Sequence, residues 1–289
     1  MYRIKIDDGL CNTDGLCVRV CPAGVFGQED DNPPETIAPE ACIACGHCAA
    51  ICPTRAVQHE AFPTGEVPRI DRNLQPSFEE LREMLRARRS RRAFTDAPVD
   101  RELIEKVIDA AELAPTAVNC RSTEYTIVQD TTTLQGVVRL TGAYLGKLAG
   151  QASNPLSRFL LKTFGGREAL AAIKGRKKLA EAAREVAAGN DIILYQAPVL
   201  LLMHADRAAP FACANANLAH QNATMAAEAL GLANFYTGFI VSACERDRRI
   251  PDLLDIPKTH QVYAGMAFGH ARLDYERWVD RGESMVHWF

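Results

Sequence analysis

Two cysteine-rich stretches near the N-terminus restrict this chain more than any other feature. Residues 11–22 read CNTDGLCVRVCP, and residues 42–53 read CIACGHCAAICP. The second stretch has cysteines at 42, 45, 48 and 52, whereas the first has them at 11, 17 and 21, with Asp14 where a fourth is missing. Most of the cysteines of the chain are therefore gathered in two repeats of one spacing, which indicates a shared ligand.

This spacing is typical of proteins that bind iron–sulfur clusters. In the pattern C-x-x-C-x-x-C-x-x-x-C-P, three thiolates on a tight loop hold one cluster, and the cysteine before proline ligates the other cluster. A zinc ribbon is the alternative, but paired C-x-x-C motifs do not account for seven cysteines with two Cys-Pro ends. With the fourth ligands exchanged, the two expected sites are one [4Fe–4S] cluster on Cys21, Cys42, Cys45 and Cys48, and a second cluster on Cys11, Asp14, Cys17 and Cys52.

Asp14 changes the chemistry expected at the second cluster. Over about sixty residues the segment resembles the bacterial-type two-cluster ferredoxin module, and Asp14 is its one departure. A carboxylate is a harder ligand than a thiolate and binds iron less firmly. Two outcomes stay open: the corner iron is absent, which gives a [3Fe–4S] cluster, or it is kept in an Asp-ligated [4Fe–4S] cluster. Loss of the whole cluster is disfavoured, because its three cysteines remain.

Charge and proline content separate this segment from the rest of the chain. Residues 1–60 carry four Lys or Arg against nine Asp or Glu, whereas residues 61–289 carry 29 against 27. Residues 61–76 contain three prolines and are typical of a linker. We therefore expect an iron–sulfur domain over residues 1–60, a linker over 61–76 and a second domain over 77–289.

The composition is typical of a soluble protein. The chain is 47% hydrophobic, enough for a packed core, and its net charge of −3 argues against a protein that mainly binds nucleic acid. Its most apolar stretch, residues 192–203, is interrupted by Gln196 and Pro198 and is too short to span a bilayer. No signal peptide is apparent, so we expect a cytoplasmic location where thiols stay reduced.

Residues 77–289 mix helical and strand patterns. Ser77-Phe-Glu-Glu80 is a capping-box signal for a helix that runs towards Arg89, and Asp100 is expected to cap the next helix. Strands are predicted at residues 125–128, 199–204, 234–240 and 262–268, and helices at 167–188 and 215–230, the last ended by Gly231. The pattern indicates an α+β or α/β layer fold. Neither a G-x-G-x-x-G after a strand nor a P-loop is present, which disfavours Rossmann and Walker nucleotide sites.

A run of arginines precedes the second of these helices. Residues 88–94 read RRSRRAF and are followed by PVD three residues later. Such a run is usually a solvated helix face, and a nucleic-acid patch is the other general interpretation. The order of residues resembles the entry motif of the nitroreductase family of FMN flavoproteins, in which arginines and a serine bind the flavin phosphate, ribityl chain and ring edge. Guanidinium groups suit a phosphate, and a cation suits the N1–C2=O edge of the reduced flavin.

Later segments extend this resemblance over nearly all of residues 78–289. Residues 110–119, AAELAPTAVN, are similar to the family loop that reaches the flavin across a dimer interface, and residues 189–191, GND, match a position where an Asn contacts the ring. Residues 229–238, ALGLANFYTG, are similar to a turn whose backbone amides face flavin N5, and a late Arg or Lys closes on the phosphate. The resemblance assigns FMN contacts to Arg88, Arg89, Ser90, Arg92, Pro115, Thr116, Ala117, Asn119, Asn190, Tyr236, Thr237, Gly238 and Arg281, with Arg277 as the rival of Arg281.

Departures from the family pattern concern the expected substrate pocket. The family often has Trp where Tyr236 stands, and Tyr keeps a flat ring there. Arg121 begins a segment where the family often has Gln-Pro-Trp. If the side chain of Arg121 faces the pocket, it would favour an anionic substrate; if it faces solvent, it is a surface charge. Residues 144–188 are expected to cover the pocket.

The resemblance implies both a fold class and an activity. The fold class is α+β, with a ferredoxin-type iron–sulfur domain followed by a nitroreductase-like α+β sandwich that forms a homodimer. The implied enzyme is an oxidoreductase that passes electrons from the clusters, or from NAD(P)H, through FMN to a small electron-poor acceptor such as a nitroaromatic or a quinone. No catalytic side chain is expected, since the chemistry is centred on the flavin.

Two alternatives remain for the function. One is a specialised FMN reductase that carries out a dehalogenation, an ene reduction or a step of cofactor synthesis. The other is an electron carrier or redox sensor that serves a protein partner. A nucleic-acid or membrane partner is not expected from the charge and hydropathy of the chain.

Overall fold

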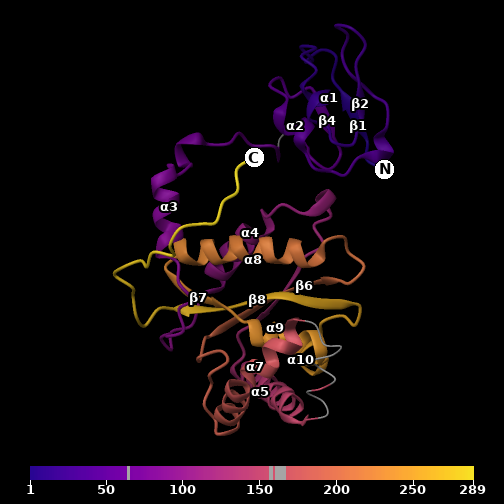
Figure 1. Cartoon of the computed structure of the whole chain (residues 1–289). Helices are drawn as coiled ribbons and strands as arrows, with labels where there is room; N and C mark the ends of the chain where they lie inside the picture. Colours follow the sequence, from indigo (N-terminus) through magenta and orange to yellow (C-terminus); the bar gives the residue numbers. More distant parts are fainter. Residues whose placement is uncertain (64–65, 156–158, 160–166) are drawn as a thin grey trace. The chain divides into compact units, whose positions relative to one another are not determined.

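The chain forms two compact units in the computed structural model, which describes residues 1–63, 66–155, 159 and 167–289, with the backbone alone at 167–172 (Figure 1). The first unit comprises Met1–Pro76 and Thr116–Cys120, and the second comprises Ser77–Pro115 and Arg121–Phe289. The division after Pro76 lies where the composition changes. The proline-containing residues 61–76 group with the first unit rather than standing apart.

The first unit is built on two short antiparallel strand pairs. Strand β1 (Ile4–Ile6) pairs with β4 (Val57–His59), and β2 (Phe26–Gly27) pairs with β3 (Glu35–Thr36). Helices α1 (Leu16–Val20) and α2 (His47–Ile51) pack against each other, and 3₁₀ turns occupy Pro39–Ala41, Arg72–Leu74 and Ala117–Asn119. Its small core combines aliphatic side chains with cysteines: Ile4, Cys17, Val25, Phe26, Cys48 and Val57.

The two cysteine stretches fold in the same way. Thr13 and Ala44, which lie 31 positions apart, both have positive φ angles, of 57° and 49°. Gly15 and Gly46, at the same offset, have φ angles of 64° and 74° and begin α1 and α2. These left-handed residues turn the chain sharply ahead of each helix. The sequence repeat is therefore also a repeat of backbone geometry.

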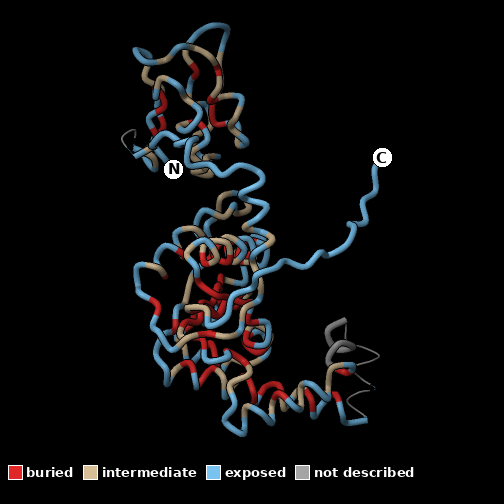
Figure 2. The backbone as a smooth tube through the Cα atoms, turned by 90° about the vertical axis from the view of Figure 1, so that its left-hand side faces the viewer, coloured by how far each residue is buried: buried red, intermediate tan, exposed pale blue. Residues whose placement is uncertain are grey.

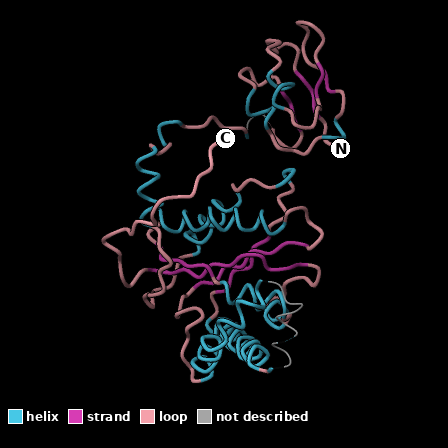
Figure 3. Tube along the Cα trace, in the orientation of Figure 1, coloured by secondary structure: helices cyan, strands magenta, loops and turns pink. Residues whose placement is uncertain are grey.

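The second unit is organised around a four-stranded antiparallel sheet in the order β5-β6-β8-β7. Its strands are β5 (Glu124–Val128), β6 (Val199–Asp206), β7 (Leu232–Tyr236) and β8 (His260–His270). Helices α4 (Arg101–Glu112) and α8 (Ala212–Ala229) cover one face, as Figures 1 and 3 show. The other face is covered by α5 (Thr131–Ser153), α7 (Arg167–Ala187), α9 (Gly238–Arg246) and α10 (Arg249–Leu253).

Strand β6 supplies core residues to both faces. Leu200 and Leu202 join the cluster under α5 and α9, whereas Leu201 and Met203 join the cluster under α4 and α8. Buried residues follow the sheet and its covering helices in Figure 2, and residues 272–289, after β8, are all exposed. In strand β6, residues 199–203 are all apolar because this part of the sheet is sandwiched between two helical layers. No helix in the described part of the chain is both long and apolar enough to cross a membrane.

Most of the predicted elements are confirmed. Helix α3 (Phe78–Ala87) begins with a complete capping box between Ser77 and Glu80. Helix α8 ends at Ala229, just before Gly231 with its φ of 73°. The apolar stripe from Leu103 to Ala111 on α4 packs into the core, although Asp100 makes no side-chain cap hydrogen bond in the described structure.

Helices α5 and α9 were not predicted from the sequence, and α9 shortens a predicted strand. The strand predicted over 234–240 ends at Tyr236, because Gly238 begins α9 and Ile240 is buried on that helix. Helix α5 was not expected, since its opening Thr-Thr-Thr and several β-branched residues have weak helix propensity. Asp130 caps it through Thr133 N at 2.7 Å, and packing against α7 over its length stabilises it.

Candidate functional site

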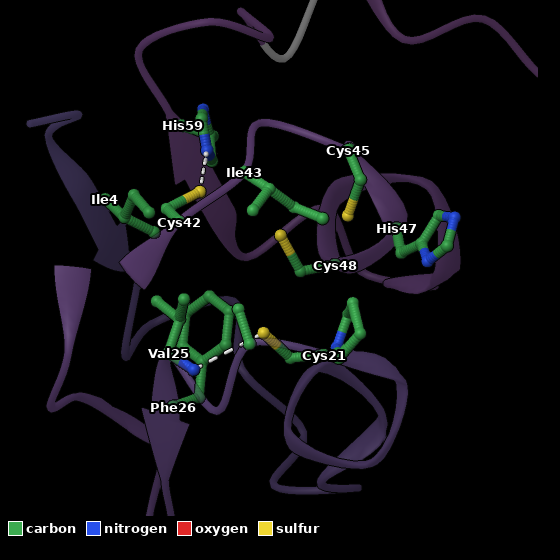
Figure 4. A pocket seen from close by; sticks show the side chains of 13 residues that line it. Ile4, Cys21, Val25, Phe26, Cys42, Ile43, Cys45, His47, Cys48 and His59 are labelled. Atoms are coloured by element: carbon green, nitrogen blue, oxygen red, sulfur yellow. Dashed lines mark hydrogen bonds between the residues drawn. The ribbon is translucent and has the colours of Figure 1, made fainter. Parts of the chain in front are cut away.

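Four of the cysteines that were assigned to one cluster line a single cavity in the first unit. They are Cys21, Cys42, Cys45 and Cys48, and their sulfur atoms turn towards the same space in Figure 4. The remaining wall is mostly apolar and includes Ile4, Val25 and Phe26, together with the two histidines His47 and His59. Cys21 comes from the first repeat and the other three come from the second. The tertiary structure thus brings together the set that the exchange of fourth ligands predicts.

The pKa of Cys48 reflects this crowding. It is raised to about 11, mainly by burial and further by the nearby thiols of Cys45, Cys21 and Cys42. A group of thiols in a buried apolar site resists ionisation unless a cation shares it. Metal or cluster ligation removes that penalty, because thiolates are the binding form.

Cys11 and Cys17 of the first repeat form a second group with Cys52 of the second repeat. The pKa of Cys17 is raised chiefly by burial, and the thiols of Cys52 and Cys11 add to the effect. Asp14 stands at the position equivalent to Cys45, and its Oδ1 accepts a hydrogen bond from Leu16 N at 3.0 Å. Asp14 therefore also closes the turn that begins α1, a local role that its carboxylate performs without iron.

Backbone amides point at the sulfur atoms of both Cys-Pro cysteines. Val25 N lies 3.3 Å from Cys21 Sγ, and Ala56 N lies 3.3 Å from Cys52 Sγ, each four residues further along the chain. Donors aimed at a ligating sulfur stabilise its negative charge and tune the reduction potential of a cluster. The loops are thus preorganised to hold thiolates.

His59 is a contact of this site that sequence reasoning missed. Its Nδ1 accepts a hydrogen bond from Ala61 N at 3.1 Å, so the ring proton of the neutral form resides on Nε2. Nε2 lies 3.4 Å from Cys42 Sγ and donates towards it. Burial lowers the pKa of His59, which keeps the ring neutral. No spacing rule would have selected it, because β4 brings it to the site from outside the cysteine repeats.

In the second unit, three arginines gather where the resemblance placed a phosphate. The pKa of Arg88 is lowered by burial and then by the positive charge of Arg281. Arg89 donates to the carbonyl oxygens of Arg86 and Arg88 at 2.9 and 3.1 Å, while its buried Nη2 has no partner among the described residues. Crowded guanidinium groups with an orphaned N–H fit an anion between them.

The neighbouring Arg91 has a structural role instead. Its guanidinium lies 2.8 Å from the carboxylate of Glu228 and 3.1 Å from that of Asp274. Its backbone N donates to Asn234 O at 3.0 Å, which fixes the arginine run along the start of β7. Ser90 also forms an isolated parallel β-bridge with Asn234. Within one run of arginines, Arg91 is thus engaged in ion pairs, whereas Arg88 and Arg89 belong to the candidate anion site.

A cavity of about 670 Å³ opens beside the end of β7. Tyr236, Thr237 and Gly238 line it, together with Arg92, whose guanidinium lies 5.2 Å from the ring centre of Phe235. Further lining residues come from the region predicted to cover a pocket, and they include Tyr144 and Lys178, whereas most of residues 156–166 lies outside the described part. The cavity combines aromatic faces with cations, a surface suited to a flat ring system.

The turn at Thr237 is tightly held. Thr237 N donates to Gly265 O at 2.9 Å, and a side chain at Gly265 would place its Cβ only 2.5 Å from Thr237 Oγ1. The hydroxyl is buried and has no partner among the described residues. Gly238 is the first residue of α9, so its N–H has no acceptor within the helix. The turn can therefore present donors to a ligand.

His220 is a second residue that the sequence reasoning did not select. Its ring meets that of Tyr236 edge to face at 4.8 Å, and its buried Nε2 has no partner among the described residues. Burial, followed by the positive charge of Arg88, lowers the pKa of His220 to about 4. A neutral imidazole thus lies between the arginine group and the tyrosine that borders the cavity.

Other residues assigned to FMN lie elsewhere. Thr116, Ala117 and Asn119 group with the first unit, where Asn119 Nδ2 donates to Ala44 O at 2.7 Å. Asn190 lines a different cavity, and its side chain donates to Glu185 Oε2 at 2.7 Å. Pro115 directly precedes Thr116–Cys120, the segment that groups with the first unit, and itself belongs to the second unit. The cavity at β7 is therefore built without these five residues in this structure.

Arg121 is directed to the surface. It pairs with Glu112 at 3.3 Å, and its side chain is 66% exposed. The outward interpretation of this arginine, as a surface charge, is the one that fits the structure.

Together these features test whether the second unit fits FMN. Arg88, Arg89 and Arg281 suit the phosphate, the unpaired Thr237 hydroxyl and the first-turn N–H of Gly238 suit ring acceptors, and Arg92 supplies a cation. The orphaned buried donors are the strongest sign, because buried polar groups are normally paired. The residues present fit the group.

Comparison with known proteins agrees with both halves of the chain. Residues 85–270 match the model of the nitroreductase family, and residues 3–53 match that of the 4Fe-4S dicluster domain. Over 49 residues, or 17% of this chain, the sequence is 43% identical to a protein named Ferredoxin 7Fe from Hydrogenibacillus schlegelii. The chain spans 60% of the length of that relative.

Solved structures share the fold of the second unit. A nitroreductase with bound FMN from Bacteroides fragilis superposes with a TM-score of 0.53 at 20% identity, covering 72% of this chain and 98% of that one. An iodotyrosine deiodinase bound to FMN and 3-iodo-L-tyrosine gives 0.53 at 18% identity, with the same two coverages. At these identities the likeness establishes the fold alone.

Proposed function

The chain belongs to the nitroreductase family, with a 4Fe-4S dicluster domain ahead of the family domain, and we propose that it delivers electrons from its clusters through FMN to a small electron-poor aromatic acceptor. Its standing as an FMN and iron–sulfur oxidoreductase follows from the two domains. The acceptor class and the route of the electrons are the proposal. The observation that carries it is the cation-bordered aromatic cavity at the end of β7.

The lining of that cavity favours particular acceptors. Arg92, Lys178 and Arg246 contribute positive charge, and no Asp or Glu occurs among its described lining residues. Tyr195, Phe235 and Tyr236 contribute aromatic surface. A nitroaromatic or a quinone presents a flat ring with electron-rich oxygen atoms, and charge on those oxygens grows as the acceptor is reduced. Positive side chains at the rim stabilise that charge.

Protein residues position the cofactors and the acceptor. FMN, when bound, supplies two-electron chemistry and can also accept single electrons, which is the form in which iron–sulfur clusters pass them. Arg88, Arg89 and Arg281 would hold its phosphate. Arg92 and the first amides of α9 would polarise the ring, and Tyr236 would border the acceptor. No side chain is required as a general acid or base in this scheme.

We further propose that the second cluster has three irons. Asp14 already accepts a hydrogen bond from Leu16 N, which occupies the carboxylate locally. The printed name of the ferredoxin relative, 7Fe, is consistent with one three-iron and one four-iron cluster. Iron analysis of anaerobically purified protein should then give about seven irons per chain, and an Asp14→Cys variant about eight. Eight irons in the unaltered protein would show that the corner is filled.

The acceptor is tested with the reduced full-length protein. We would reduce the FMN-loaded protein with dithionite, remove the excess and mix it anaerobically with nitrobenzene, 4-nitrobenzoate or benzoquinone while recording flavin absorbance. Rapid reoxidation is expected, with 4-nitrobenzoate more affected than nitrobenzene by Lys178→Gln. Lys106→Gln is the matched control, because Lys106 pairs with Glu102 on α4, away from the cavity. Slow reoxidation by every small acceptor would overturn the proposal and favour an electron carrier for a protein partner.

The source of the electrons is tested separately. If the clusters are the entry point, then NADH and NADPH reduce the flavin slowly, whereas a low-potential one-electron donor reduces it quickly. Cys48→Ser should remove that fast phase and leave FMN binding unchanged. Fast reduction by NADPH, at the same rate in the variant and the unaltered protein, would establish direct reduction of the flavin instead.

Reductive dehalogenation is a second candidate. It is favoured by the fold shared with iodotyrosine deiodinase, whose structure contains FMN and 3-iodo-L-tyrosine. Release of iodide from 3-iodotyrosine by the reduced protein would support it. Reoxidation by nitroaromatics without any halide release from halogenated phenols would exclude it in favour of the first. A homodimer is proposed for either activity, and its mass in solution tests it.

A further inference from the structure

Three side chains that the proposed flavin chemistry does not use converge at one end of the central sheet. His204 Nδ1 and His260 Nδ1 lie 2.9 Å apart, and His260 Nδ1 lies 3.9 Å from Glu124 Oε2. One ligand atom from each of the three lies within 4.8 Å of the others. They come from β6, β8 and β5, so the convergence joins three adjacent strands.

The strand register explains why they meet. Glu124 of β5 is directly opposite His204 of β6. Between β6 and β8 the register shifts at Met203 and His204, so that His204 faces Val262 and lies diagonal to His260. A bulge of this kind redirects side chains and is common beside functional sites. Here it directs two imidazoles and a carboxylate towards one point.

Burial and hydrogen bonding preorganise the imidazoles. His204 and His260 are 4% and 9% exposed, whereas the Glu124 side chain is 61% exposed. His204 Nε2 lies 2.9 Å from Thr126 Oγ1. When Nε2 donates to that hydroxyl, Nδ1 of the same ring presents its lone pair to the convergence point. A partner on the far nitrogen is the usual way in which a protein orients a histidine ligand.

We propose that Glu124, His204 and His260 bind a divalent transition-metal ion, with Zn²⁺ the best match to the ligand set. Two imidazole nitrogens and one carboxylate are a common zinc set that leaves a fourth position open. Ligands about 2.0–2.1 Å from a tetrahedral ion are about 3.3 Å apart, so the two Nδ1 atoms need to separate by only a few tenths of an ångström. The exposed Glu124 side chain can rotate to close the set and gives the ion a path from solvent.

This site is separate from the redox centres. None of its three residues lines the cavity beside β7, and all of them belong to the second unit. Because the ion would join three strands of the folded state, it would stabilise the second unit by an amount that rises with the logarithm of its concentration once that exceeds the dissociation constant. The inference is independent of the proposed acceptor and of the cluster type.

The test is zinc binding by the full-length protein carrying its clusters and FMN. After anaerobic dialysis against Zn²⁺, we expect about one zinc per chain, with iron content unchanged. Zinc X-ray absorption should show nitrogen and oxygen neighbours at about 2.0–2.1 Å and no sulfur at about 2.3 Å. Sulfur neighbours or lost iron would place the zinc at the cysteines and overturn the assignment.

Variants of the proposed ligands distinguish zinc binding at this site from zinc binding elsewhere on the protein. Glu124→Gln and His260→Gln should each weaken zinc binding by about tenfold or more and abolish the rise in melting temperature that zinc produces. His270→Gln is the matched control, since it removes a histidine from the same strand at its opposite end. Glu124→Gln is a surface change, so loss of binding there cannot be attributed to misfolding. Unchanged zinc affinity in Glu124→Gln and His260→Gln would overturn the proposal.

Discussion

The guanidinium of Arg91 and the carboxylate of Glu228 form an ion pair at 2.8 Å, and their side chains are only 13% and 9% exposed. The pair joins the arginine run to the C-terminal part of α8. It therefore fixes the segment from which Arg88, Arg89 and Arg92 reach their own positions. Removing Glu228 leaves the buried charge of Arg91 with only the exposed carboxylate of Asp274 as a partner.

We expect Glu228→Gln to destabilise the protein by about 2–4 kcal/mol, because the neutral amide cannot balance the charge of Arg91. Chemical denaturation of the second unit, followed by far-UV circular dichroism, measures this. Asp274→Asn is the control: Asp274 also contacts Arg91 but is 84% exposed, so its loss should cost less than about 1 kcal/mol. Equal effects of the two variants would contradict a buried pair.

Arg88→Gln should weaken FMN binding by about 10- to 100-fold, because a charge-assisted contact to the phosphate is lost. Calorimetry with FMN and with riboflavin distinguishes this role from a general disturbance. Riboflavin has no phosphate, so its affinity should be the same in the variant and the unaltered protein. Arg82→Gln, on the exposed side of α3, is the control and should change neither affinity.

Cys21→Ser should damage the cluster of the second repeat, although Cys21 belongs to the first. The reason is that Cys21 lines the cavity of Cys42, Cys45 and Cys48. Mössbauer spectroscopy on iron-57-enriched protein should show loss of the four-iron component with the other cluster retained. Cys213→Ser, at an exposed cysteine outside both repeats, should leave the spectrum unchanged. Loss of the cluster on Cys11, Cys17 and Cys52 instead would refute the exchange of ligands.

His220 should make stability depend on pH. Its pKa is lowered to about 4 in the fold by burial and by Arg88, against about 6.5 when unfolded. Between these values the unfolded chain binds the extra proton, so stability is fully present above about pH 6.5 and is lost as pH falls towards 4. At about pH 5.5 the loss should be about 1 kcal/mol relative to pH 8.

The apoprotein is the sample for that measurement, because acid also attacks iron–sulfur clusters. The dependence should be flatter in His220→Gln over the same range. His287→Gln, near the exposed C-terminus, should behave as the unaltered protein does. A parallel decline in His220→Gln and the unaltered protein would assign the acid loss to other groups.

Local sequence signals were sufficient for much of the architecture. The capping box at Ser77 and Glu80 is a short-range interaction, so it could be read from four residues and formed as expected. The apolar run at residues 199–203 was likewise a local signal, and it correctly indicated a strand there. Helix α5 escaped prediction because its stability comes from packing against α7, which no local window contains.

The candidate sites likewise contain residues that local sequence patterns could identify and residues whose roles depend on distant neighbours. The spacing of the cysteines predicted two sets of cluster ligands, because a tight loop fixes the order in which thiolates can meet one cluster, and the structure groups Cys21 with Cys42, Cys45 and Cys48 as predicted. The arginine run marked the segment that we propose binds the flavin, but it could not distinguish Arg91 from its neighbours. That distinction depends on Glu228, which lies 137 positions further along the chain.

The sequence alone thus determined the two domains, the iron–sulfur loops and the family of the larger domain. Only the tertiary structure brought His59 to Cys42, His220 to Tyr236, and Glu124 to His204 and His260. Each of these contacts depends on strand register or on helix packing between distant segments. Single histidines carry no spacing signal, and their chemistry is decided by the neighbours that folding provides.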